Sequence, residues 1–341
     1  MKRKFTLFLI LTLLSYCVTY ASTIRINSSL STDKAHQLFA NLQEAHDDAS
    51  VVSGDTLLVE GSIKNYTDLV CTKRLVIIGP GYFLSQNPNT QANPLPAYVQ
   101  HIAFNKGSEG SSLIGLTFMN NSTNYLPEIK VDNITIMRCY LYHGISLSGK
   151  VNNLLILQNY FERSALSLFS TNDSFSGIIF KNNVVRVSLS VSEYDGIPRT
   201  FAVVDNNIFT GEVKLTAASF RNNIIVSKTS SVQVNSTSVQ NNLTGGDQLS
   251  AKPTNQTFIS DDLFVGLAGA NQSLDAQYHL KATSPYLKAG YNGSEPGIFG
   301  GMEPYVLSGI PPIPTIYEIQ ADAVATKDGG LKVTVKAKVN P

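Results

Sequence analysis

The 341-residue sequence predicts an all-β fold, a parallel β-helix in which short strands of successive coils stack into long sheets. Three observations predict it. A strand motif centred on an asparagine recurs about every 20 residues, a second alternating segment lies between most copies, and no intervening segment has helical periodicity. Parallel strands in an α/β fold would need roughly ten or more helical residues at each crossover, so stacked coils explain this spacing better.

Residues 1–21 have the layout of a secretory signal peptide. Basic residues at positions 2–4 precede an apolar run from Phe5 to Leu14, and Ala21 is the expected cleavage point. That run is too short to span a bilayer, and no later stretch reaches the roughly 18 apolar residues that a spanning helix needs. We therefore expect an exported protein without a membrane span, either secreted or held at the cell surface.

The segment 35–49, AHQLFANLQEAHDDA, predicts an amphipathic helix near the start of the mature chain. Its apolar residues recur at helical spacing: Leu38, Leu42, Ala45 and Ala49. Such a helix would cap the first coil, whose open end otherwise exposes a sheet edge and the apolar interior. Strands are expected directly afterwards in GDTLLVEG, residues 54–61, and in KRLVIIGPGYFL, residues 73–84.

The repeated motif is anchored on six positions, four of which open an asparagine doublet: Cys139, Asn159, Asn182, Asn206, Asn222 and Asn241. The intervals between them are 20, 23, 24, 16 and 19 residues, as variable loops around a regular core would give. Residues two before and two after each anchor are apolar, so strand alternation points the anchors inward. We expect a buried structural ladder in which each amide bonds to the next coil, with the second asparagine of each doublet outward.

These coils and their cap are expected to form one domain over residues 22–305. Residues 306–314 contain the proline-rich GIPPIP and predict a linker or an extended segment lying across the surface, and residues 315–341 predict a C-terminal β-hairpin extension. Two alternating runs in that extension flank Lys327-Asp328-Gly329-Gly330, a turn sequence typical of hairpins. The last run places polar residues on one face, where lysines would protect a sheet edge: Lys332, Thr334, Lys336 and Lys338.

Charge and cysteine content exclude several classes of protein. Loss of the signal peptide leaves 23 basic residues against 25 acidic ones, so no nucleic-acid partner is expected. The two remaining cysteines, Cys71 and Cys139, are expected to be buried thiols rather than a disulfide. The histidines lack metal-ligand spacing and no phosphate-binding glycine loop is present, so we predict no metal site and no cofactor.

With these features, residues 35–305 resemble the secreted right-handed parallel β-helix proteins of the pectate-lyase-like superfold. The resemblance rests on the helix followed by GDTLLVEG, on LVIIGPGYF, on the asparagine repeats and on the closing YHLKATSPYLKAG and GIFGG. It implies a right-handed coil. It implies no single function, because this superfold hosts lyases, hydrolases, esterases and adhesins.

The catalytic motifs of the superfold are not assembled in this chain. Polygalacturonase-like hydrolases carry four motifs, but here Asp261-Asp262 stands without its companions and His143-Gly144 lacks the preceding glycine. Pectate lyases need calcium-binding carboxylates on neighbouring coils. The available carboxylates fall in different columns of the repeat: Glu162, Asp205 and Glu212. Whether the protein is an enzyme stays open.

The best candidate binding residues come from the same alignment. Four residues after three successive anchors stand His143, Arg163 and Arg186, which would form a basic ladder for the carboxylate or sulfate groups of a glycan. Three tyrosines beside this ladder offer flat faces for sugar rings: Tyr140, Tyr142 and Tyr160. The structural alternatives are ordinary solvated charges and tyrosines that only fill half-buried strand positions.

The leading functional hypothesis is a monomeric exported protein that binds an extracellular polymer, above all a polysaccharide, without recognised catalysis. Two alternatives belong to other classes. The first is a divergent polysaccharide lyase or glycoside hydrolase, and the second is a structural or adhesive surface protein. Release of product from a polysaccharide would separate the enzyme from the two binding hypotheses.

Overall fold

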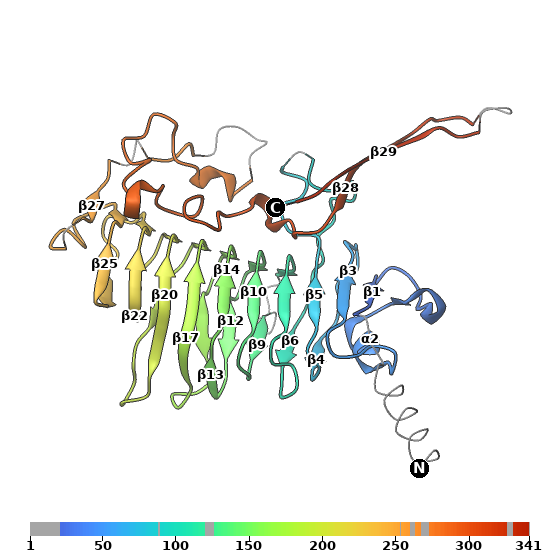
Figure 1. The fold of residues 1–341 in the computed structure, drawn as a ribbon, viewed down its shortest axis with the longest axis horizontal. Coiled ribbons are helices and arrows are strands. Elements are labelled where there is room, and N and C mark those ends of the chain that lie inside the picture. The colour runs from blue at the N-terminus through green and yellow to red at the C-terminus, as the bar shows by residue number, and fades with distance from the viewer. Residues whose placement is uncertain are drawn as a thin grey trace, which may run out of the picture.

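The computed structural model describes residues 21–87, 89–119, 126–252, 254–259, 263–266, 273–325 and 330–340. In this part of the chain the fold is all-β, with long parallel sheets and very little helix (Figure 1). That confirms the predicted class and is compatible with a parallel β-helix. The predicted signal peptide up to residue 20, the Asp261-Asp262 pair and the hairpin turn at 327–329 lie outside the described residues.

Three sheets run along the molecule. Sheet A has 14 strands: β1 (Thr23–Ile26), β2 (Leu38–Phe39), β3 (Thr56–Val59), β5 (Val76–Ile78), β7 (Ser112–Ile114), β10 (Thr135–Met137), β13 (Lys150–Asn152), β14 (Leu155–Leu157), β17 (Ser174–Lys181), β19 (Leu189–Val191), β20 (Arg199–Asp205), β22 (Val213–Arg221), β24 (Val232–Asn235) and β25 (Ser238–Gln240). Sheet B has eight: β8 (Thr117–Phe118), β11 (Tyr140–Leu141), β15 (Tyr160–Phe161), β18 (Val184–Val185), β21 (Ile208–Phe209), β23 (Ile224–Ile225), β26 (Leu243–Thr244) and β27 (Gln256–Thr257). Sheet C has five: β4 (Leu69–Cys71), β6 (Ile102–Phe104), β9 (Pro127–Ile129), β12 (Ile145–Leu147) and β16 (Leu166–Leu168).

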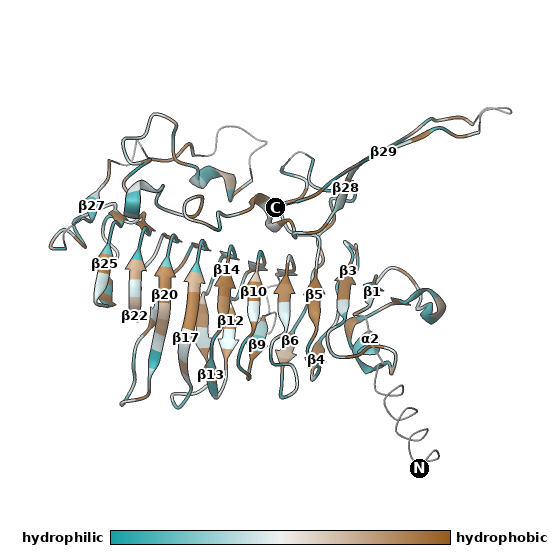
Figure 2. Ribbon diagram, viewed as in Figure 1, coloured by the Kyte–Doolittle hydropathy of each residue, from teal (hydrophilic) through white to brown (hydrophobic). Residues whose placement is uncertain are grey.

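In the repeats from β7 to β16, successive strands visit the three sheets in turn, whereas in later repeats β19 and β24 pair within sheet A. Strands β10, β11 and β12 belong to sheets A, B and C, and β14, β15 and β16 repeat that order. Each strand pairs in parallel with its counterpart one repeat later, as Met137 does with Leu157 and Leu141 with Phe161. Side chains from all three sheets join one buried apolar core, and Figure 2 shows the hydrophobic residues concentrated along the strands.

The predicted N-terminal helix is shorter than its sequence pattern. Helix α2 spans Leu42–Asp47, and only Leu42, Ala45 and His46 are buried on it. It begins there because the side chain of Asn41 accepts a hydrogen bond from the backbone N–H of Glu44, a standard N-cap. The preceding apolar residues form β2, which pairs with β1 and so satisfies its backbone groups as a strand. The helix still contacts β1, β2 and β4 at the first repeats, where a cap was predicted.

The buried amide ladder exists, but at each doublet it lies one residue later than predicted. Its members are Cys139, Asn159, Asn183, Asn207, Asn223, Asn242 and Asn255. The backbone N–H of Asn183, for example, donates to Asn207 Oδ1 at 2.9 Å, and that of Asn207 donates to Asn223 Oδ1 at 2.9 Å. Each amide therefore satisfies a backbone group of the previous repeat, most of them in the buried interior of the molecule.

The first asparagine of each doublet makes the turn from sheet A to sheet B, which corrects its predicted ladder role. The residues concerned have positive φ between 52° and 60°: Asn182, Asn206, Asn222 and Asn241. Asparagine tolerates this left-handed conformation better than most residues. Strand alternation does not continue through such a residue, and Leu157 pairs with Lys181, so Asn159 aligns with Asn183 rather than with Asn182.

These turn asparagines bind residues 289–310, a segment that we name the strap. Asn241 Nδ2 donates to the Ala289 carbonyl at 3.1 Å. Asn182 Nδ2 donates to the carbonyls of Ile298 and Gly300 at 2.8 and 2.9 Å. Arg138 and Gln158 occupy the same turn in earlier repeats, and we name the six residues the turn row. Its other members bind the strap in the same order: Arg138, Gln158, Asn206 and Asn222. Later repeats bind earlier strap residues, so the strap runs back along the stack (Figure 1).

A second apolar cluster covers the outer face of sheet B. Outward residues of the sheet pack against residues from the chain after β27 and against Tyr82: Tyr140, Tyr160, Val184, Ile208, Ile224 and Leu243. The covering side chains include Phe258, Leu263, Tyr278, Ile298 and Tyr305. The C-terminal part of the chain therefore seals one whole face of the stack.

The C-terminal hairpin is present as predicted. Strands β28 (Thr315–Ala321) and β29 (Val333–Lys338) are antiparallel, and Lys336 Nζ bonds to Glu318 Oε2 at 2.8 Å. They pair with no other described strand and project away from the three sheets (Figure 1). The cysteines are also as predicted, because Cys71 and Cys139 are free and buried. Burial raises the pKa of Cys71 to about 11 and that of Cys139 to about 12.

Candidate functional site

The candidate site lies where the chain leaves the strands of sheet B. Tyr142 and His143 follow β11, Glu162 and Arg163 follow β15, and Arg186 follows β18. We name these five residues the corner cluster. They come together because their strands are parallel neighbours in sheet B, so equivalent positions of successive repeats lie side by side.

The predicted basic ladder is not continuous across three repeats. Leu141, Phe161 and Val185 are aligned in sheet B, which places Arg186 beside Glu162 and not beside Arg163. Arg186 Nη1 lies 3.0 and 3.2 Å from the two carboxylate oxygens of Glu162. Its charge is therefore paired within the protein. The predicted position of Arg186 was wrong for the same reason as the predicted ladder. The sequence alignment matched Asn159 with Asn182 instead of Asn183, which displaces the following positions by one residue.

Two of the three predicted sugar-stacking tyrosines are buried. Tyr140 is 6 % exposed and Tyr160 is 0 % exposed. Their rings stack on each other with centroids 5.6 Å apart, and Phe83 packs edge-on against both at 5.4 Å. Burial raises the pKa of both hydroxyls. Neither ring offers a face to a ligand, so their role is to anchor the chain segments that cover sheet B.

The remaining predicted residues do form a surface. The guanidinium of the exposed Arg163 lies 5.5 Å from the centroid of the half-buried Tyr142 ring, a cation–π distance. The ring of His143 meets Tyr142 edge-on at 4.9 Å. Arg163 forms no ion pair with the residues that the structure describes. A planar cation held over an aromatic ring is oriented for bidentate contact with a carboxylate or sulfate group.

Sequence reasoning missed a second polar group, on the outer face of sheet C. Glu128 carboxylate oxygen Oε2 lies 2.9 Å from Lys130 Nζ and 3.7 Å from His101 Nε2. Ser146 of the next repeat is the Cα partner of Glu128. The spacing of Glu128 and Lys130 puts both on one face of a strand, which the sequence could have signalled. His101 joins them only through a pairing across an irregular interval, for which the sequence gives no local sign.

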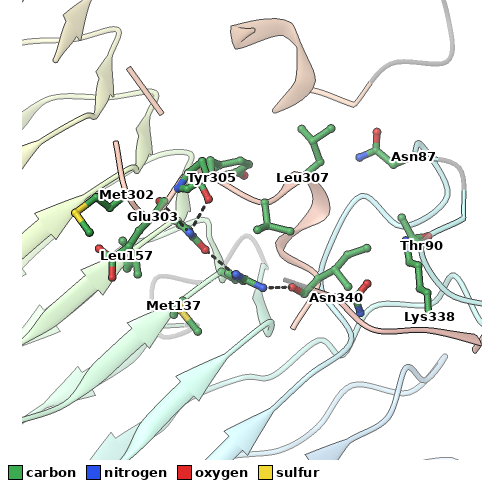
Figure 3. Close-up of a pocket in the computed structure, with 15 residues that line it drawn as sticks. Asn87, Thr90, Met137, Leu157, Met302, Glu303, Tyr305, Leu307, Lys338 and Asn340 are labelled. Atoms are coloured by element: carbon green, nitrogen blue, oxygen red, sulfur yellow. Dashed lines mark hydrogen bonds between the residues drawn. The ribbon is translucent and has the colours of Figure 1, made fainter. Parts of the chain in front are cut away.

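A cavity of about 730 Å³ opens between the strap and the turn row, and Figure 3 shows it. Its apolar lining comes from both sides: Met137, Leu157, Met302, Pro304, Val306, Leu307 and Ile310. Its polar groups hold the strap in place. Gln158 Nε2 donates to the carbonyls of Glu303 and Pro304, at 3.0 and 2.7 Å, and Arg138 Nη1 donates to that of Ile310 at 2.7 Å. We therefore regard this cavity as a gap beneath the strap.

No group of three or more histidine, cysteine, aspartate or glutamate side chains in the described ranges is arranged to hold a metal ion. None of the helices in the same ranges has the length and apolar character needed to cross a membrane. Comparison with protein-family models, with curated proteins and with solved structures finds no match to this chain.

Proposed function

We propose that this chain is an exported right-handed parallel β-helix protein that binds an extracellular polysaccharide bearing acidic groups. The observation that carries the binding proposal is the exposed guanidinium of Arg163, held over the ring of Tyr142 beside His143. The parallel pairing of successive repeats in sheets A and B, and in sheet C up to β16, supports the coil, and parallel crossovers are right-handed in nearly all proteins.

The corner cluster suits a polymer better than a small ligand. It lies on an open surface of adjacent repeats, which are spaced by about 4.8 Å, so a linear chain could contact several of them in succession. An aromatic face and a guanidinium supply the two contacts that acidic sugars accept, namely stacking and bidentate hydrogen bonds. Because Arg186 is paired with Glu162, we expect Arg163, with His143 beside it, to contact the acidic groups.

Affinity electrophoresis in gels containing polygalacturonate or chondroitin sulfate tests this function. We expect the wild-type chain to be retarded, and the double change His143→Ser and Arg163→Ser to lose most of that retardation, about tenfold in apparent affinity for two charge-assisted contacts. Lys150→Ser is the matched control, because Lys150 is an exposed cation away from the cluster. Unchanged retardation of the double variant, or an equal loss in Lys150→Ser, would refute the proposal.

A divergent polysaccharide lyase or glycoside hydrolase is the second candidate, and one observation favours it. Glu128 stands between an ammonium and an imidazole on the outer face of sheet C, which are the group types used in proton transfer. Assay of the same polysaccharides for newly formed reducing ends and unsaturated products separates the two functions. Product release that disappears in Glu128→Gln would establish the enzyme, and binding without product would establish the binding protein.

A further inference from the structure

A row of short polar side chains crosses the outer face of sheet A. We name it the hydroxyl row: Asp132, Asn152, Ser176, Thr200, Thr216 and Asn235. Thr216 is the Cα partner of both Thr200 and Asn235, and Asn152 that of Ser176. The residues next to the row in its strands face the core, as the buried Phe175, Phe201 and Leu215 do. The row itself therefore faces outward.

The surface is hollowed along the second half of this row. A shallow cavity of about 510 Å³ is lined there by Thr200, Thr216 and Asn235 together with small residues, among them Gly177 and Ala202. The β17–β20 pairing contains register shifts at Ile178, and such bulges bend strands locally. Small side chains and bent strands together leave room for a ligand against the sheet.

Three of the polar side chains that line the hollow have no hydrogen-bond partner among the described residues. In the first half of the row the side chains bond to one another, as Ser176 Oγ does to Asn152 Oδ1 at 2.7 Å. In contrast, the side chains of Thr200, Thr216 and Asn235 make no hydrogen bond with any residue that the structure describes. Each threonine hydroxyl can donate once and accept twice, and the amide can do both. Three successive repeats thus present donors and acceptors to solvent, spaced by about 4.8 Å.

No charged side chain is among the residues that line the hollow. A ligand that complements this surface is therefore uncharged and carries both hydrogen-bond donors and acceptors at regular spacing. Sugar hydroxyls are uncharged and both donate and accept hydrogen bonds. Consecutive sugar residues also repeat along a polysaccharide as the strands repeat along the sheet.

We propose that this hollow binds a neutral, hydroxyl-rich linear polysaccharide running across the strands of sheet A. The site is separate from the corner cluster, and it rests on the proposed function only in that the chain meets extracellular polysaccharide. Recognition comes from hydroxyl and amide hydrogen bonds to successive sugars, with no contribution from fixed charge.

Affinity electrophoresis with neutral polymers tests this site. Gels contain mixed-linkage β-glucan, galactomannan or dextran, and a polygalacturonate gel reports on the corner cluster independently. We expect wild-type retardation in at least one neutral gel and about a tenfold weaker apparent affinity for the double change Thr200→Val and Thr216→Val, because two hydrogen-bonding groups are lost without change of shape. Retardation in the polygalacturonate gel should be the same for both proteins.

Two controls make the outcome decisive. The double change Thr200→Ser and Thr216→Ser keeps the hydroxyls and should keep the retardation, and Thr67→Val removes an exposed hydroxyl elsewhere. Lack of wild-type retardation in every neutral gel, or equal retardation of the valine double variant, would overturn this site. Failure confined to the polygalacturonate gel would overturn the corner cluster alone.

Discussion

At the turn from sheet A to sheet B, each asparagine doublet divides two tasks between adjacent residues. Asn206 adopts the left-handed conformation that reverses the chain, and its amide reaches outward to the Gly297 carbonyl of the strap. Asn207 points into the core, where its amide bonds to Phe180 of the previous repeat and to Asn223 of the next. The doublet therefore bonds both to the neighbouring repeats and to the strap.

Substitution of either member of the doublet separates the two tasks. We expect Asn207→Leu to lower the free energy of unfolding by about 3 kcal/mol, because leucine leaves the buried groups of Asn183 and Phe180 unpaired. Asn206→Gly keeps the left-handed turn and loses the bonds to the strap and a long hydrogen bond from Asn222 Nδ2, so we expect a loss of about 1 kcal/mol. Urea unfolding measures both values, and equal losses would contradict a ladder built from the second asparagine.

The asparagine doublet also explains what the sequence could and could not predict at the scale of single residues. A stacked amide ladder with Cys139 and Asn159 in it followed from the repeat, because apolar residues flank every motif. Which member of a doublet enters the ladder did not follow, because period-two alternation stops at a left-handed residue. The single asparagine of the Gln158-Asn159 pair was therefore aligned with the wrong partner, and Arg186 was misplaced with it.

Among the elements, the strap gains its position from a buried polar contact as well as from apolar packing. The hydroxyls of Tyr82 and Tyr305 are hydrogen-bonded to each other, and Tyr305 also donates to Asp275 Oδ2 at 3.3 Å. The backbone N–H of Ser308 donates to the same carboxylate oxygen at 2.7 Å. Burial raises the pKa of the Asp275 carboxyl above its ordinary value. Residues more than 200 positions apart meet here, and no local pattern in the sequence signals such a contact.

The strap contact should make the stability of the fold depend on pH. A carboxyl whose folded pKa is raised contributes stability that is complete below its unfolded pKa and is lost as pH rises through the folded value. We therefore expect the wild-type chain to lose stability relative to Asp275→Asn when the pH rises from about 4 to about 7, because asparagine cannot ionise. Urea unfolding of both proteins across that range gives the difference. A difference that stays constant with pH, or grows in favour of the wild type, would exclude ionisation of Asp275 as the cause.

At the scale of the whole molecule, two C-terminal segments relate to the stack in opposite ways. Together with Phe258, Leu263 and Tyr278, which precede it in the chain, the strap covers the outer face of sheet B. Its Ile298 and Tyr305 are buried there. The hairpin leaves Ile319, Val333 and Val335 at least half exposed and pairs with no other described strand. The hairpin was predictable, since both strands and the turn are local. The cover over sheet B was not, because Tyr140 and Tyr160 look in sequence like any half-buried strand tyrosines.

Truncation should distinguish these two roles. A chain that ends after Ile316 keeps the bond from the Ala92 backbone N–H to the Ile316 carbonyl. It loses the exposed hairpin and the bonds of Asn340 to Ile313 and Thr315. We expect its midpoint of thermal unfolding to fall by only a few degrees, roughly 1 kcal/mol of stability in a protein of this size.

A chain that ends after residue 288 lacks the strap, so Tyr140, Ile208 and Ile224 lose much of their cover. Exposure of that apolar face should increase binding of the dye ANS and lower solubility, because large contiguous apolar patches bind dyes and associate. If the two truncated chains behaved alike in both measurements, the strap would be dispensable to the stack, and the division between cover and projecting hairpin would be wrong.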